Sequence, residues 1–124
     1  MATVLVVEDE FGIADLLDSV LTEEGYRVFT AMNGQEGLEL AVREHPSLII
    51  SDYMMPVMDG ATMLVRINAD PALQSTLVVM MSSMPEATVA ERCTGYETFL
   101  RKPFNLFEVV DLVQRLIGRP DEAA

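Results

Sequence analysis

The stretch "SLIISDYMMPVMDG" (residues 47–60) contains an apolar run that stops at a carboxylate. Residues 48–51 are typical of a strand that is buried on both faces. Asp52 follows this run directly, where a turn or a functional site would explain a charged side chain. Asp59 is expected to cap the next helix, and Gly60 is expected to permit an unusual backbone conformation.

Similar short apolar runs alternate with segments of helical period along the whole chain. We expect strands at residues 3–7, 26–31, 48–51, 77–81 and 98–101. In the helical segments, apolar residues recur mostly every three or four positions. The first segment includes Phe11 and Leu16, the fourth covers about residues 86–93, and the last includes Phe107. Because parallel strands need crossover connections, this order predicts an α/β fold with a doubly wound parallel sheet and helices on both faces.

The length and composition favour one folded domain. Half of the 124 residues are hydrophobic and 23% are charged, which suffices for a substantial core. We expect this domain to span residues 1–119 and the polar residues 120–124 to form a disordered tail. Cys93 is the only cysteine, and we expect a small, partly buried thiol without a chemical role.

The charge of the chain restricts its partners. Lys and Arg number 8 against 20 Asp and Glu, which gives a formal net charge of -12. Such a chain repels nucleic acid and anionic membrane surfaces, so we expect no direct contact with either. No apolar run approaches the roughly 20 residues that span a bilayer, and residues 1–10 lack a basic segment typical of signal peptides. The sequence therefore predicts a cytoplasmic protein.

Polar residues follow four of the expected strands. They are Glu8, Asp9 and Glu10 after the first strand, Asp52 after the third, Ser82 and Ser83 after the fourth, and Lys102 after the fifth. Ligands of doubly wound sheets bind beyond the carboxyl ends of the strands, so these residues are expected at one rim. Carboxylates that converge there repel one another unless a cation lies between them. Oxygen ligands favour Mg²⁺, with Mn²⁺ as the alternative.

An aspartate beside Mg²⁺, a hydroxyl and a lysine can form and hold an aspartyl phosphate. The carboxylate is then the nucleophile. The metal, the ammonium and the hydroxyl neutralise charge on the oxygens of the transferred phosphoryl group.

These motifs resemble the receiver domain of two-component response regulators over roughly residues 3–117. The resemblance rests on "VVEDE" at residues 6–10, on "DYMMPVMDG" at residues 52–60, on Ser82 and on "FLRKPF" at residues 99–104. The second motif matches the family pattern D-x-x-M-P-x-M-D-G. The resemblance implies a five-stranded, flavodoxin-like sheet of order 2-1-3-4-5.

The resemblance also implies a role for each residue of the motifs. Asp52 is the expected phosphoacceptor, and Lys102 is expected to pair with the phosphate. Glu8 and Asp9 are expected to bind the metal, with the Met54 backbone carbonyl as a further metal ligand. Ser82 is the expected switch hydroxyl, and Phe99 is the expected aromatic switch residue. A histidine kinase or a histidine phosphotransfer protein would donate the phosphoryl group. A downstream protein would bind the face formed by the fourth helix, the fifth strand and the last helix.

The resemblance further implies a monomer or weak dimer that is no enzyme beyond its own phosphorylation and slow dephosphorylation. Met54 and Met84 lie two residues after Asp52 and Ser82, and thioethers hold an attacking water poorly. We therefore expect a phosphorylated half-life of many minutes or longer.

Several positions depart from the family pattern. Glu8 stands where Asp is frequent, Ser82 replaces Thr, and Ser83 and Tyr96 replace alanine. The spacing between Ser82 and Lys102 is about two residues shorter than usual. We therefore expect the fourth helix to be short or distorted.

Three competing interpretations come from other functional classes. A haloacid dehalogenase-type hydrolase would carry its nucleophile in a D-x-D-x motif after the first strand, where this chain has Glu8-Asp9-Glu10-Phe11. A dinucleotide-binding domain would need G-x-G-x-x-G in the first turn, where only Gly12 is found. A pseudo-receiver that is never phosphorylated and serves as a docking module stays open.

Overall fold

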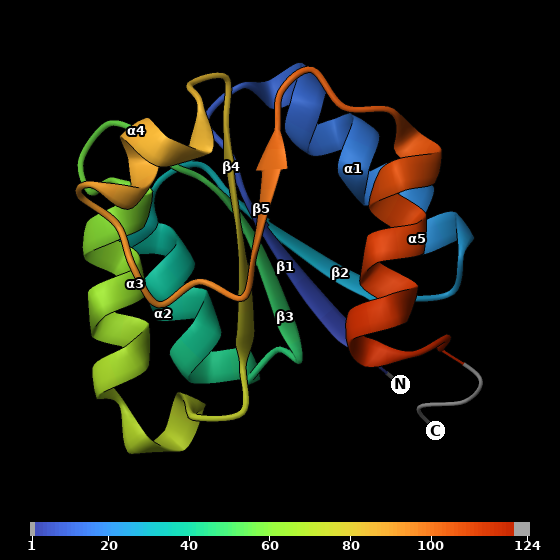
Figure 1. The fold of residues 1–124 in the computed structure, drawn as a ribbon. Helices are drawn as coiled ribbons and strands as arrows, with labels where there is room; N and C mark the ends of the chain where they lie inside the picture. The colour runs from blue at the N-terminus through green and yellow to red at the C-terminus, as the bar shows by residue number, and fades with distance from the viewer. Residues whose placement is uncertain (1, 121–124) are drawn as a thin grey trace.

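The structure is a computed structural model that describes residues 2–120. Within these residues it contains one five-stranded, all-parallel sheet of order β2-β1-β3-β4-β5 (Figure 1). The strands are β1 (Thr3–Val7), β2 (Arg27–Ala31), β3 (Leu48–Asp52), β4 (Leu77–Ser82) and β5 (Thr98–Arg101). The predicted fold class and strand order are therefore confirmed.

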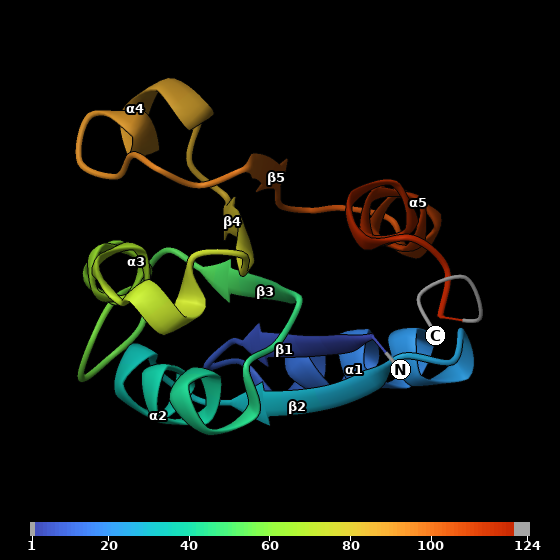
Figure 2. The same cartoon turned by 90° about the horizontal axis from the view of Figure 1, so that it is seen from below.

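Helices cover both faces of this sheet. They are α1 (Phe11–Glu23), α2 (Gly34–Glu44), α3 (Gly60–Ala69), α4 (Glu86–Ala90) and α5 (Leu106–Ile117), with a 3₁₀ turn η1 (Pro71–Leu73). Seen from below in Figure 2, α1 and α5 lie on one side of the sheet, whereas α2, α3 and α4 lie on the other.

The strands are apolar because both of their faces are buried. Along β1, Val4 and Val6 belong to the core cluster under α1 and α5, whereas Leu5 and Val7 belong to the cluster under α2 and α3. All four side chains are at most 1% exposed. Successive side chains of a strand point to opposite faces, so a continuous apolar run is the pattern that a doubly covered sheet requires.

Side-chain caps fix where three helices begin. Asn33, Asp59 and Asn105 each accept a hydrogen bond from the backbone N–H three residues later, at 2.9, 2.8 and 2.7 Å. Such caps satisfy backbone donors that the first helical turn leaves unpaired. The expected capping role of Asp59 is confirmed.

Several predicted boundaries shift by one to three residues. Asp52 and Ser82 are the last residues of β3 and β4 rather than the first residues after them, and β2 begins at Arg27. The helix expected over about residues 86–93 ends at Ala90, so the prediction of a short fourth helix is confirmed. Cys93 lies beyond its end and is buried.

The expectation that Phe11, Leu16 and Phe107 continue the apolar faces of their helices is wrong. Phe11 is 73% exposed, Leu16 is 49% exposed and Phe107 is 87% exposed. α1 contacts the core through Ala14, Leu17 and Leu21. Phe11 and Phe107 stand in the first turns of α1 and α5, which can extend past the sheet, whereas Leu16 lies inside α1 but outside the side of the helix that carries its buried residues.

Two expectations concern the chain end and membranes. Residues 121–124 of the expected tail lie outside the described residues. Among the helices of residues 2–120, none combines the length and the apolar character needed to cross a membrane.

Gly60 is required by close packing rather than by an unusual backbone conformation, which corrects our expectation. Its φ is not among the positive values of the described glycines. A Cβ on Gly60 would lie 2.3 Å from the backbone oxygen of Asp52 and 3.0 Å from Sδ of Met80. Its N–H also donates to the Tyr53 backbone oxygen at 2.9 Å. The start of α3 therefore packs directly against the end of β3.

We predict that Gly60→Ala lowers the free energy of unfolding by about 2–3 kcal/mol, because the added methyl overlaps backbone that cannot move freely. Urea denaturation measures the change. Gly12→Ala is the matched control, because a Cβ at Gly12 meets nothing within 4 Å. This control is expected to stabilise the protein by about 0.5–1 kcal/mol, since Gly is unfavourable in helices. Equal effects of the two substitutions would contradict the packing argument.

Candidate functional site

The parallel strands bring residues from distant parts of the sequence to one edge of the sheet. Val7 pairs with Ser51, Asp52 with Met81, and Ser82 with Arg101, so the carboxyl ends of β1, β3, β4 and β5 lie in register. Glu8, Asp52, Ser82 and Lys102 occupy or directly follow these ends, as the sequence predicts.

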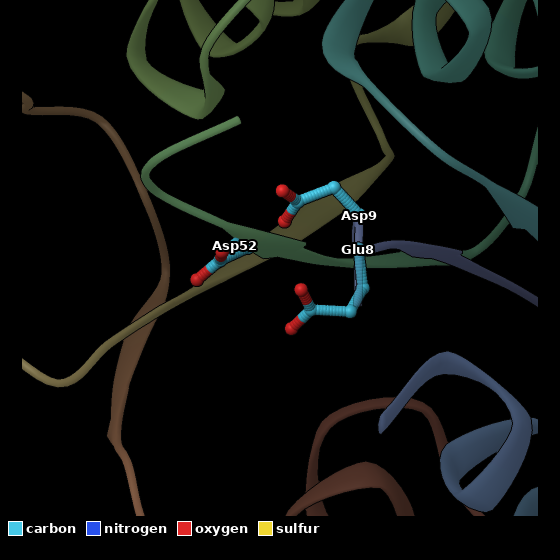
Figure 3. A group of neighbouring side chains, drawn as sticks. All are labelled: Glu8, Asp9 and Asp52. Carbon is cyan, nitrogen blue, oxygen red and sulfur yellow. The ribbon is translucent and has the colours of Figure 1, made fainter. Parts of the chain in front are cut away.

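Three carboxylates form an acidic cluster at this edge: Glu8, Asp9 and Asp52. They offer oxygen atoms that all lie within 4.8 Å of one another. Glu8 is 1% exposed and Asp52 is 8% exposed, whereas Asp9 is exposed to solvent. Figure 3 shows the three carboxylate groups directed toward the same space. Their convergence is the arrangement that the sequence predicts.

Lys102 reaches into the acidic cluster from the end of β5. Its Nζ lies 2.7 Å from Oε1 of Glu8 and 3.1 Å from Oδ1 of Asp52. The side chain of Lys102 is 18% exposed. The ammonium is thus a partial counter-charge to two buried carboxylates, and the contact with Glu8 is one that the sequence did not reveal.

The electrostatics of the site leave negative charge incompletely balanced. Burial raises the pKa of Asp52 above its usual value, although the charge and hydrogen bond of Lys102 oppose this shift. Burial likewise raises the pKa of Glu8, against the hydrogen bond from Lys102. Burial alone would lower the pKa of Lys102, but the hydrogen bond to Glu8 and the charge of Asp52 outweigh it and raise this pKa. A further cation would therefore be stabilised here.

The acidic cluster fits a hard divalent cation. Its donors are all carboxylate oxygens, which Mg²⁺ prefers, and their mutual distances allow a single ion to contact more than one of them. Burial raises the pKa of Glu8 and of Asp52, so an additional positive charge at this position would stabilise their ionised forms. Met54 is 64% exposed, and the expected role of its backbone carbonyl stays a prediction.

Ser82 lies at the carboxyl end of the neighbouring strand β4 and is 4% exposed. Its Oγ accepts a hydrogen bond from the backbone N–H of Met84 at 3.0 Å. Its backbone oxygen accepts one from the N–H of Lys102 at 2.9 Å. The hydroxyl is therefore held at the rim that carries Asp52, and Ser82 also fixes the start of the segment after β5.

Phe99 lies within β5 and is partly buried against the core cluster under α2 and α3. Its ring centroid lies 6.2 Å from that of Tyr96, at an interplanar angle of 50°. The Tyr96 hydroxyl donates to Oε2 of Glu86 on α4 at 2.9 Å. Burial and this hydrogen bond raise the pKa of Tyr96 to about 12, so the phenol remains a donor at neutral pH. Sequence reasoning noted Tyr96 only as an unusual residue and missed this link between α4 and β5.

Comparison with known proteins agrees with this arrangement. Residues 4–114 match the family described as the response regulator receiver domain. The sporulation initiation phosphotransferase F of Bacillus subtilis is 32% identical over 116 residues, which cover 92% of both chains. The chain also matches a probable transcriptional regulator of Porphyra purpurea at 33% identity, but it spans 49% of that protein's length.

Solved structures share the fold closely. The chemotaxis response regulator CheY4 of Vibrio cholerae superposes with a TM-score of 0.85 at 32% identity, over 94% of this chain and 98% of that chain. The receiver domain of a sensor histidine kinase from Pseudomonas aeruginosa has a TM-score of 0.88 at 27% identity, with the same coverage. That structure holds a magnesium ion coordinated in its active-site cleft. The family match and the site geometry together show that this chain belongs to the response regulator receiver domains of two-component signalling systems.

Proposed function

We propose that this chain is a phosphorylation-activated switch in which Asp52 accepts a phosphoryl group from a histidine kinase or a histidine phosphotransfer protein. The observation that carries this proposal is the position of Lys102, whose ammonium lies 3.1 Å from Asp52 inside the acidic cluster. A buried carboxylate beside a fixed ammonium is suited to attack a phosphoryl group and to hold the product.

In the proposed transfer, an Asp52 carboxylate oxygen attacks phosphorus and forms the new O–P bond. The P–N bond of the donor phosphohistidine breaks, and the imidazole nitrogen keeps the electron pair. Lys102 then pairs with an oxygen of the transferred group, and the Ser82 hydroxyl can donate to another by turning from its present contacts. Bound Mg²⁺ would neutralise part of the charge on the phosphoryl oxygens, and the acidic cluster is where it would be held.

The output would pass through the face formed by α4, β5 and α5. Phe99 on β5 is the expected switch residue, and its partly buried ring contacts Tyr96. Because Tyr96 is hydrogen-bonded to Glu86, a movement of either aromatic ring would be transmitted to α4. We propose that this change alters the binding of a downstream protein.

Two further expectations belong to this proposal. We propose that the chain turns over no substrate besides its own phosphoryl group, and that it acts in the cytoplasm without contacting nucleic acid directly. The competing function is a docking module that is never phosphorylated. The presence of the acidic cluster, with Lys102 paired to its Asp52, favours the phosphorylated switch over the docking module.

We predict that acetyl phosphate with Mg²⁺ adds a single phosphate to the wild-type chain and none to Asp52→Asn, as measured by intact mass. Asp59→Asn is the matched control, because Asp59 caps α3 and asparagine caps helices equally well. This control should be phosphorylated as the wild type is. Absence of phosphate on the wild type would favour the docking module. Phosphate on Asp52→Asn would show that a residue other than Asp52 is the phosphoacceptor.

We predict that Mg²⁺ at ten times its dissociation constant raises the free energy of unfolding by about 1.4 kcal/mol at pH 7. The raised pKa values mean that Glu8 and Asp52 bind protons more tightly in the folded chain than in the unfolded chain. Without metal, their contribution to stability therefore falls as the pH rises above about 4. Mg²⁺ should reverse this loss, so its effect should shrink toward pH 4. Thermal unfolding with and without Mg²⁺ measures the stabilisation by the metal at each pH. Equal stabilisation at pH 4 and pH 7 would contradict the prediction.

We predict that the phosphorylated protein loses its phosphate over many minutes or longer. Polar residues in place of Met54 and Met84 should accelerate this loss. Met54 follows Asp52 by two residues and is 64% exposed, and Met84 follows Ser82 by two residues, with its backbone N–H bonded to the Ser82 hydroxyl. Met54→Asn with Met84→Gln would hold an attacking water better than two thioethers. Phosphate release measures the rate, with the exposed Met32→Asn as the control. Decay of the wild type within seconds would refute the prediction.

A further inference from the structure

The fourth helix, α4, is too short to be stable without contacts to the rest of the chain. It contains five residues, whereas an isolated helix in water needs about 12. Its buried side chain is Val89, which belongs to the core cluster under α2 and α3. A second contact is the hydrogen bond from the Tyr96 hydroxyl to Oε2 of Glu86, the first residue of α4, at 2.9 Å. The position of α4 therefore depends on a small number of side chains, and Tyr96 is one of them.

Tyr96 lies in the connection between α4 and β5, at residues 91–97, where the backbone on both sides of it is anchored (Figure 1). On one side, the Gly95 backbone oxygen accepts a hydrogen bond from the Asn68 side chain of α3 at 3.4 Å. On the other side, the Glu97 N–H donates to the Val78 backbone oxygen of β4 at 2.8 Å. The Tyr96 side chain therefore extends from backbone that α3 and the sheet hold in place.

The same side chain contacts Phe99, the expected aromatic switch residue. The two ring centroids lie 6.2 Å apart at an interplanar angle of 50°, within the range of favourable aromatic pairs. Both rings pack against the core cluster under α2 and α3. In the same structure, Oγ of Ser82 accepts a hydrogen bond from the Met84 N–H, a contact that the proposed transfer would break. Tyr96 therefore contacts Phe99 in the arrangement that precedes this transfer.

We propose that Tyr96 is a positioning residue that links α4 to β5 and holds Phe99 in the arrangement that precedes phosphorylation. This inference rests on the proposed function and adds a residue that sets how easily the switch turns. If the Phe99 ring turns away from Tyr96, the ring contact breaks, and if α4 moves away from β5, the hydrogen bond to Glu86 breaks. Contacts made in one conformation alone lower the population of the other. Tyr96 therefore reduces the fraction of molecules that adopt the switched arrangement.

The first test follows α4 in the full chain without a phosphodonor, so its outcome does not depend on phosphorylation. Amide hydrogen exchange is measured at Val89, Arg92 and Cys93, whose N–H groups donate hydrogen bonds within α4 and just after it. Tyr96→Phe removes the hydroxyl and keeps the ring, so exchange at these amides should become about threefold to tenfold faster. Tyr96→Ala also removes the ring contact and should accelerate the exchange further.

Tyr26→Phe is the matched control, because it removes a phenol hydrogen bond far from α4. The Tyr26 hydroxyl donates to the Gly118 backbone oxygen at 2.6 Å, and Tyr26 directly precedes β2, at the opposite edge of the sheet from β5. This control should leave exchange at the α4 amides unchanged. Glu86→Gln keeps a side-chain oxygen that can accept from Tyr96, so its exchange should stay within about twofold of the wild type. Exchange in Tyr96→Phe equal to that of the wild type would overturn the inference.

The second test measures the switch with beryllofluoride and Mg²⁺, which stand in for the phosphoryl group on an aspartate and its metal. A variant that adopts the switched arrangement more often should bind beryllofluoride more tightly. The apparent dissociation constant, followed by amide shifts, is expected to fall about threefold in Tyr96→Phe and about tenfold in Tyr96→Ala, and to stay unchanged in Tyr26→Phe.

A Tyr96 that serves folding alone would leave this dissociation constant unchanged or raise it, and either result would overturn the inference. Failure of the wild type to bind beryllofluoride would instead refute the proposed function. The exchange measurement would then still decide whether Tyr96 holds α4, because it needs neither metal nor phosphodonor.

Discussion

The pairing of one lysine with two buried carboxylates is the interaction on which the site depends. Glu8 and Asp52 are almost inaccessible to solvent, and burial raises the pKa of each. Lys102 contacts both, at 2.7 and 3.1 Å, and thereby makes their shared location tolerable in the absence of another cation. Asp9 adds a third, exposed carboxylate. The remaining negative charge would favour a divalent ion at this place, which the proposed phosphorylation of Asp52 requires.

The sheet makes this pairing possible because it is parallel and doubly covered. The four strands that carry the site all end at the same edge, and their register brings residues of β1, β3, β4 and β5 together there. Close packing of Gly60 against the backbone of Asp52 connects the proposed phosphoacceptor to α3. On the other side, β5 carries both Lys102 at its end and Phe99 within it, so the chemical site and the proposed output face share one strand.

Much of this arrangement was predictable from the sequence. Apolar runs bounded by polar residues identified all five strands, and the position of Asp52 after such a run identified the site. The exposure of Phe11 and Phe107 was not predictable, because helical periodicity does not reveal where a helix extends past the sheet. The Glu8–Lys102 and Tyr96–Glu86 contacts were also missed. Each joins side chains whose meeting depends on rotamers and on the path of a loop, which residue spacing along the chain does not encode.

The central claim is that Asp9, Asp52 and Lys102 surround a single space that takes one divalent cation. Crystals soaked in Mn²⁺, with diffraction data collected above the manganese absorption edge, test it most directly. We expect one strong anomalous peak within about 2.5 Å of carboxylate oxygens of both Asp9 and Asp52, with Lys102 still bonded to Glu8. Anomalous peaks found solely at other surface carboxylates, or Lys102 turned away from Asp52 and Glu8, would contradict it.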